Sequence, residues 1–169
     1  MNPSFRRHGD AIRMELDDGE VALLRELHEQ LRRWLADPDP ADPVMARLFP
    51  PCAPEDDLVD AEVRALIFED LLAERIAGLD EVIAIIDRGR ARSGRVRVDL
   101  DEDEPSLLLG VLNDIRLALG ARIGITTLDR NEVDEDHPAA WGLLVMDHLA
   151  FLQEQLIRLL DPAAASDEW

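Results

Sequence analysis

Two stretches of this chain, 84 positions apart, repeat the same pattern of residues. Residues 12–36 (IRMELDDGEVALLRELHEQLRRWLA) align without gaps to residues 96–120 (VRVDLDEDEPSLLLGVLNDIRLALG), with identity at 8 of the 25 positions. Each stretch begins with alternating apolar and charged residues, the period of a half-buried strand. Each continues with acidic residues and then with apolar residues at three- and four-residue spacing, which indicates an amphipathic helix. We interpret the repeat as a duplication, whose halves we expect to pack about an approximate two-fold axis.

The charges of the two stretches predict how their strands pair. If the strands run antiparallel with Arg13 opposite Asp99, then Glu15 lies opposite Arg97. Opposite charges directly across an antiparallel pair each contribute about 0.2–1 kcal/mol. We therefore expect these strands to be neighbours in one small sheet.

The first half is expected to contain a hairpin, two long helices and a proline-rich connection. Residues 4–8 and 11–16 alternate on either side of Gly9-Asp10, a turn signal. A helix then runs to residue 36, with Asp17 and Glu20 at capping-box spacing. The connection, 37–56, holds six of the ten prolines and an apolar cluster that we expect to dock as one helical turn (Val44, Met45, Leu48 and Phe49).

The second long helix, from Asp56 or Asp57 to about Asp87, carries a wide apolar stripe and is expected to be the central packing element. The second half follows a loop at residues 88–94. It is expected to contain a strand from 95, a helix capped by Asp101 and Glu104 that ends at Gly120, a loop at 121–137 with a short extended piece at 122–126, and a helix from near Pro138 to 160.

The predicted fold class is α+β and mostly helical. It is a duplicated β-α-α unit, with a small antiparallel sheet packed on about four main helices. Residues 1–169 are predicted to form a single domain built from two halves, 11–87 and 95–161.

Composition limits the classes of function. The chain has a net charge of −19, and its 18 basic residues are all arginines. This acid excess repels nucleic acid and anionic membranes, so direct nucleic-acid binding and membrane binding are not expected. No apolar run approaches the ~20 residues that span a bilayer. The N-terminal residues lack the apolar core of a signal peptide. A cytoplasmic location is therefore expected.

Five arginines lie within ten residues of this acidic chain: Arg88, Arg90, Arg92, Arg95 and Arg97. Arg6, Arg7 and Arg13 occupy the equivalent place in the first half and are expected to join the same patch if the strands adjoin. One interpretation is a binding site for an acidic protein partner or a phosphate. The other is that these arginines neutralise neighbouring acids of the chain itself.

Two further sets of residues are candidates for a site. Asn113, Asp114, Arg116 and Arg122 lie in an otherwise apolar stretch and predict a polar network in the core. Cys52 is the only cysteine, which excludes an intramolecular disulfide and a cysteine-based metal cluster. A lone thiol is either a redox-active group or simply a small apolar residue.

No catalytic, cofactor-binding or metal-binding residue is predicted. Asp99, Asp101 and Asp103 alternate as in a calcium loop, but Glu104 stands where that loop needs glycine and Gly110 where it needs glutamate. The acidic loop at 134–137 ends in a histidine. It therefore supports one alternative function, a metal- or small-molecule-dependent enzyme.

Three motifs resemble one family. They are MARLFP at 45–50 with the following Asp56-Asp57, LNDIRLALGARIG at 112–124, and LQEQL at 152–156. Together they are similar to the actinobacterial AosR-like family of oxidative-stress regulators, formerly a domain family of unknown function, and the resemblance covers nearly the whole chain. It implies a non-enzymatic cytoplasmic regulator that acts through other proteins in transcriptional control. It implies no catalytic residues.

The functional hypothesis is therefore a regulatory protein that works by protein–protein interaction. Its partner is another protein, and a homodimer is also open. Sensing by an intramolecular disulfide needs two cysteines, and Cys52 stands alone. Any disulfide of this chain must therefore form with a second molecule.

Overall fold

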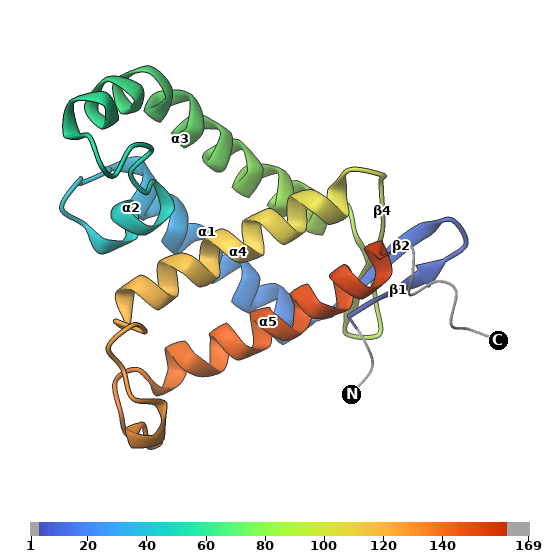
Figure 1. Ribbon diagram of the computed structural model, residues 1–169. Helices are drawn as coiled ribbons and strands as arrows, with labels where there is room; N and C mark the ends of the chain where they lie inside the picture. Colours follow the sequence, from blue (N-terminus) through green and yellow to red (C-terminus); the bar gives the residue numbers. More distant parts are fainter. Residues whose placement is uncertain (1–3, 162–169) are drawn as a thin grey trace.

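A computed structural model describes residues 4–161 as a four-stranded antiparallel sheet at one end of a group of long helices (Figure 1). The strands are β1 (Phe5–His8), β2 (Ala11–Asp17), β3 (Arg90–Arg92) and β4 (Arg95–Leu100), in the spatial order β1-β2-β4-β3. The helices are α1 (Asp18–Ala36), α2 (Pro43–Leu48), α3 (Asp57–Asp87), α4 (Glu104–Arg122) and α5 (Ala140–Leu160), with a short 3-10 helix, η1 (Arg130–Glu132), before α5. The predicted class, α+β and mostly helical, is confirmed.

The predicted strand register is also confirmed. β2 and β4 run antiparallel, with Arg13 opposite Asp99 and Glu15 opposite Arg97. The predicted hairpin of β1 and β2 forms as well, and Gly9 supplies the positive φ of 62° that its turn needs. The central pair of strands thus joins the two halves of the chain. Whether the halves arose by duplication stays a prediction.

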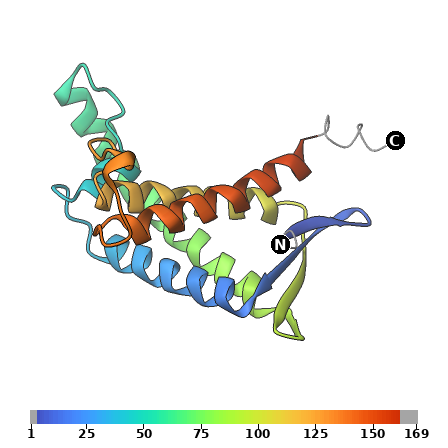
Figure 2. The same ribbon diagram turned by 90° about the horizontal axis from the view of Figure 1, so that it is seen from below.

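One face of the sheet packs on the helices and forms the core with them. Figure 2 shows the four long helices extending from the sheet in one general direction. The largest fully buried side chains come from both halves and from both kinds of element: Met14, Leu16, Leu31, Leu35, Leu48, Ile85, Ile86, Leu108, Leu112, Ile115, Leu149 and Leu152. The apolar cluster of 44–49 docks as predicted, because α2 buries Val44, Met45 and Leu48.

The predicted caps form at one helix and only partly at the other. The side chain of Asp17 accepts from the amide of Glu20, and Glu20 accepts from the amide of Asp17, a complete capping box at α1. At α4, Glu104 accepts from the Asp101 amide, but the N-cap is Asp103, which makes no capping bond. The predicted box at 101–104 is therefore only half present.

Three local predictions are wrong. Residues 90–92, predicted as loop, form the edge strand β3. Residues 123–127 are turns rather than an extended piece. α4 continues past Gly120 to Arg122.

The largest difference from prediction is in α3. Its buried residues are Gly78, Leu79, Val82, Ile85 and Ile86, all in the last third of the helix. In the first part, Leu58 and Leu66 are 80% and 79% exposed. In Figure 2 this part lies at the end of the molecule opposite the sheet and projects beyond the neighbouring helices. Only the C-terminal part of α3 is the central packing element predicted for the whole helix.

Candidate functional site

The sheet face that points away from the core carries a cluster of arginines, here called the arginine face. Side chains alternate between the two faces along a strand, and directly opposed residues share a face. The observed register therefore puts the following residues on one surface: Arg6, His8, Arg13, Glu15, Arg90, Arg92, Arg95, Arg97 and Asp99. Six arginines thus share this face with the carboxylates of Glu15 and Asp99.

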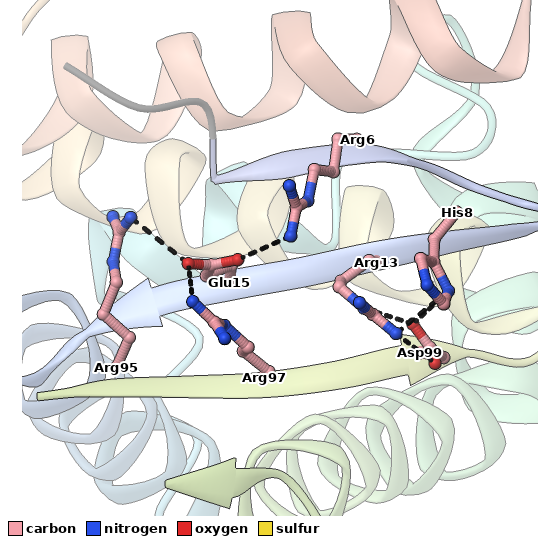
Figure 3. A network of polar contacts seen from close by, with 7 residues as sticks. All are labelled: Arg6, His8, Arg13, Glu15, Arg95, Arg97 and Asp99. Carbon is pink, nitrogen blue, oxygen red and sulfur yellow. Dashed lines mark hydrogen bonds and ion pairs between the residues drawn. The ribbon is translucent and has the colours of Figure 1, made fainter. Parts of the chain in front are cut away.

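Glu15 lies at the centre of the arginine face, on β2 (Figure 3). Its carboxylate accepts from Arg97 at 2.9 Å and Arg6 at 3.1 Å, and lies 3.5 Å from Arg95. The residue is only 7% exposed, because these side chains cover it. The hydrogen bond from Arg97 contributes most to lowering the pKa of Glu15 below its usual range. Glu15 thus stays ionised and, from β2, holds together arginines of the two neighbouring strands, β1 and β4.

Asp99, on β4, anchors the neighbouring part of the arginine face. Arg13 donates to its carboxylate through two nitrogens, at 2.7 and 2.9 Å, a bidentate pair. This hydrogen bond lowers the pKa of Asp99 and raises that of Arg13. A guanidinium nitrogen of Arg13 also lies 2.9 Å from Nδ1 of His8, and the same ring nitrogen lies 3.4 Å from the Asp99 carboxylate (Figure 3).

Arg88, at the end of α3, points instead to the start of α4. It forms an ion pair with Glu104 through two nitrogens and donates to the carbonyl of Asp99 at 3.1 Å. Burial by itself raises the pKa of Glu104, but hydrogen bonds from Arg88 and the Asp101 amide outweigh it, so the pKa is lowered. Arg88 therefore links two helices and is occupied within the chain.

Arg90 and Arg92, on the edge strand β3, are different. Both are exposed, and neither side chain makes an ion pair or hydrogen bond with any residue from 4 to 161. Arg90 also borders a cavity of about 300 Å³ between the sheet and the end of α3, lined by three further arginines, Arg13, Arg88 and Arg97. Within the described residues these two guanidinium groups therefore have no partner, which makes them candidates to bind a group from another molecule.

The five arginines predicted as one partner-binding set therefore divide. Arg88, Arg95 and Arg97 pair with acids of the chain, as the self-neutralising interpretation expects, whereas Arg90 and Arg92 pair with no acid among residues 4–161. From the first half, Arg6 and Arg13 join the arginine face. Arg7 lies on the other side of β1 and donates to the carbonyl of Leu159 at 2.6 Å.

Neither β3 nor the contacts of Glu15 with Arg6 and Arg95 were predicted from the sequence. The signal for β3 was Ser93-Gly94, whose φ values of 53° and 71° form a two-residue hairpin turn between β3 and β4. The pairing of β2 with both β1 and β4 brings Arg6 and Arg95 to Glu15 in addition to Arg97, which was predicted opposite it.

The residues predicted as a polar core network, 113–122, do not form one network. Asp114 pairs with Arg75 of α3, whereas Arg116 donates to Gln153 of α5 at 2.5 Å. Arg122 donates to Asp42, the N-cap of α2, at 2.6 Å, with its guanidinium carbon 4.6 Å from the centre of the Trp34 ring.

Asn113, the remaining member of the set, is exposed. Each charged member thus fixes α4 against a different element. These residues stabilise the packing of α4 on its neighbours, and their arrangement brings no reactive groups together.

Cys52 is exposed in the loop before α3, far along the molecule from the sheet. Its amide donates to Asp60 at 2.6 Å, and the neighbouring Ala53 amide donates to the same oxygen at 3.1 Å. These contacts order the loop. Whether the thiol is redox-active stays a prediction.

The acidic loop does not collect metal ligands. Nδ1 of His137 accepts from the amide of Ala139 at 3.0 Å, a local contact at the start of α5. Within residues 4–161 no three His, Cys, Asp or Glu side chains come together in a way that would hold a metal ion. The metal-dependent alternative gains no support from this geometry. In the same residues, no helix is both long and apolar enough to cross a bilayer.

Comparison with known proteins places the chain in a family. Residues 1–160 match the family described as "Domain of unknown function (DUF2017)". The chain belongs to the DUF2017 family. Because the match extends from the first strand to the end of α5, the arginine face lies entirely within the family's domain.

Curated relatives of this DUF2017 chain are named as regulators. The oxidative stress regulator AosR of Mycobacterium tuberculosis (strain H37Rv) is 27% identical over 184 aligned residues, which cover 91% of this chain and 84% of the relative. AosR of Mycobacterium bovis is equally similar. A putative oxidative stress regulator AosR of Mycobacterium leprae is 29% identical over 130 residues, 72% of this chain and 59% of the relative. No solved structure matches the chain.

Proposed function

We propose that this protein is a non-enzymatic regulator of an oxidative-stress response and that it acts by binding an acidic segment of another protein. The observation that carries the proposal is the arginine face, with Arg90 and Arg92 unpaired within residues 4–161. The relatives named as oxidative stress regulators support the regulatory part.

The chemistry of the arginine face favours an acidic peptide over a small substrate. Most of its guanidinium groups are already held by Glu15 and Asp99, so they are fixed in position before a ligand arrives. Preorganised groups lose less conformational freedom on binding. The unpaired arginines lie on an edge strand, where an extended acidic segment gains backbone hydrogen bonds as well as ion pairs.

Nucleic acid is a weaker candidate for the same surface. The arginine face is small, and the chain as a whole has a net charge of −19. A duplex that contacts the arginines also brings its phosphates close to the surrounding acids, which repel them.

The first test compares two double variants that lose the same charge. Arg90→Gln with Arg92→Gln removes the unpaired arginines of the arginine face. Arg33→Gln with Arg47→Gln removes two exposed arginines elsewhere. A fluorescent peptide of alternating Glu and Val residues should bind the wild type and the control alike. It should bind the first variant about fivefold or more weakly, because two ion pairs are lost.

The same titration with a DNA duplex at physiological salt tests whether the arginine face binds nucleic acid instead. Equal peptide affinity for both double variants contradicts the proposal. DNA binding that depends on Arg90 and Arg92 also contradicts it, since it assigns the surface to nucleic acid.

A second test identifies the partner in cells of the source organism. The chain has no lysine, so amine-directed crosslinkers find few groups on it. A photo-reactive amino acid at Ala91 avoids this difficulty without removing an arginine, because Ala91 is exposed on the same edge strand, on the opposite face from Arg90 and Arg92. We expect a crosslinked protein whose attached segment is acidic and whose yield changes on exposure to peroxide. Crosslinks whose yield does not respond to peroxide contradict the oxidative-stress part.

A further inference from the structure

The first part of α3 combines an exposed apolar surface with a groove. Along the helix, Leu58, Ala61, Ala65, Phe68 and Leu72 recur at three- and four-residue steps and therefore form one stripe. Leu58, Ala61 and Ala65 are exposed, and Phe68 and Leu72 are only partly buried. Soluble proteins rarely leave contiguous apolar surface uncovered unless it binds something.

Two members of this stripe, Ala65 and Phe68, form one wall of a groove together with Arg64. The groove is here called the α3 groove. The opposite wall comes from α2 and the proline-rich connection, including Met45, Phe49 and Pro38. The groove has a volume of about 460 Å³ and is lined almost entirely by apolar side chains. Phe49 of one wall and Phe68 of the other contact each other, with ring centres 4.9 Å apart. This contact joins the two walls.

The one charged side chain in the lining is already satisfied. Arg64 donates to Asp60 at 2.9 Å and to the carbonyl of Phe49, also at 2.9 Å. Its charge is balanced by Asp60, so the groove offers no unpaired cation to an anionic ligand.

The rim of the α3 groove is acidic. Glu62 and Glu69 lie beside the stripe, three or four residues from its members, and Asp70 follows them. All three are exposed, and none forms an ion pair with another residue in the described part of the chain. Residues 55–74 contain eight acids and a single arginine. A ligand that fills this groove must bring apolar side chains flanked by positive charge.

We propose that the α3 groove binds a basic amphipathic helix of a partner protein. The helix places its apolar side chains between α2 and α3 and its lysines or arginines beside Glu62 and Glu69. The stripe from Leu58 to Leu72 is about 21 Å long, which matches about 14 residues of partner helix. This surface has the opposite charge to the arginine face and is independent of the proposed function.

A second copy of this chain is a poor occupant. Two copies that meet through the α3 groove bring the same eight acids of residues 55–74 together, in chains that each carry −19. Like charges at close range disfavour such a contact. Helix-in-groove recognition by a basic partner meets no such repulsion.

The experiment uses the full chain and three fluorescent peptides of about 14 residues. The first has leucines at helical spacing and lysines elsewhere, the second replaces the lysines with glutamates, and the third scrambles the first. We expect the first to bind with an affinity at least about tenfold higher than the others, by fluorescence anisotropy. A fluorophore on Cys52, the single cysteine, sits in the loop beside the groove and should change emission in the same titration.

Matched variants separate the groove from general attraction to an acidic protein. Glu62→Gln with Glu69→Gln should weaken the basic peptide about fivefold. Asp134→Asn with Glu135→Gln removes equal charge from an exposed loop and should not. Leu58→Ser should weaken binding about tenfold, whereas Leu144→Ser, at a 65% exposed leucine on α5, should not.

Three results overturn the proposal. They are equal weakening by the two charge-matched variants, equal affinity for the scrambled peptide, and a wild type that sediments as a dimer while Leu58→Ser sediments as a monomer. The last assigns the groove to a second copy. Arg90→Gln with Arg92→Gln should leave basic-peptide binding unchanged, so the two proposals fail separately.

Discussion

Glu15 is the residue on which the geometry of the arginine face depends. It accepts from Arg6 and Arg97 and lies within ion-pair distance of Arg95, so one carboxylate balances guanidinium groups from β1 and β4. Without its charge, these arginines are left close together around a nearly buried position. The acid therefore contributes to stability and fixes the orientation of the basic groups.

Replacing Glu15 by glutamine tests this role. We expect Glu15→Gln to lower the free energy of unfolding by about 1.5–3 kcal/mol, the range for hydrogen bonds to charged groups. Urea denaturation at neutral pH measures it. Glu29→Gln, at an exposed position on α1, is the control and should change stability little.

The effect of Glu15→Gln should also depend on pH. The pKa of Glu15 is lowered in the folded state, mainly by the hydrogen bond from Arg97. Its contribution is therefore complete above the ordinary carboxyl pKa of 4.5 and is lost as the pH falls through the lowered value. The difference between wild type and variant should shrink in that range. A difference that stays constant with pH excludes the charge as its cause.

Among the elements, the β3–β4 hairpin depends on Gly89, whose backbone lies close to the side chain of Val96. A Cβ atom added there would lie 2.3 Å from Cγ1 of Val96 and 3.0 Å from the carbonyl oxygen of Ile86. The glycine therefore lets the end of α3 turn directly into β3.

Two glycine substitutions should have opposite effects. Gly89→Ala should destabilise by about 1–3 kcal/mol, as overpacking does. Gly110→Ala lies in the middle of α4 with no atom within 4 Å of the added Cβ, and should stabilise by up to about 1 kcal/mol. Thermal unfolding compares them. If Gly89→Ala melts with the wild type, the contact with Val96 is not as close as described.

The elements also show what the sequence could and could not predict. The β2–β4 register was predictable because charge pairs and apolar alternation allow one alignment of two adjacent strands. β3 was harder to predict, because its three residues, Arg-Ala-Arg, are too few to show a pattern, and only the Ser93-Gly94 turn indicates that they pair with β4. The arginine run was visible in the composition, but which arginines stay unpaired depends on long-range contacts such as Arg88 with Glu104.

At the scale of the whole molecule, packing is uneven. The sheet and the C-terminal part of α3 share the core. Between positions 57 and 77, by contrast, α3 has no buried residue. Sequence periodicity could not distinguish these parts, because an apolar stripe looks the same whether it faces a core or a missing partner. The exposed part is the one that forms the α3 groove.

Hydrogen exchange should reveal this unevenness. We expect backbone amides of residues 60–74 to exchange at least about tenfold faster than those of residues 79–86, since few buried contacts hold the first part of the helix. Mass spectrometry of peptic peptides measures both segments in one sample. Uniform protection along α3 contradicts the uneven packing. Addition of the basic peptide should slow exchange in residues 60–74 alone.

The pairing of β2 with β4 also determines when the arginine face can form during synthesis of the chain. Arg13 bonds to Asp99, 86 positions later, so half of this surface is still unsynthesised when the first hairpin leaves the ribosome. Until β4 arrives, Glu15 has only Arg6 beside it, and β2 lacks its neighbour. A chain that ends before β4 therefore cannot display the complete basic surface. Its presence marks a chain that has been synthesised past β4, and any partner that binds it selects such copies.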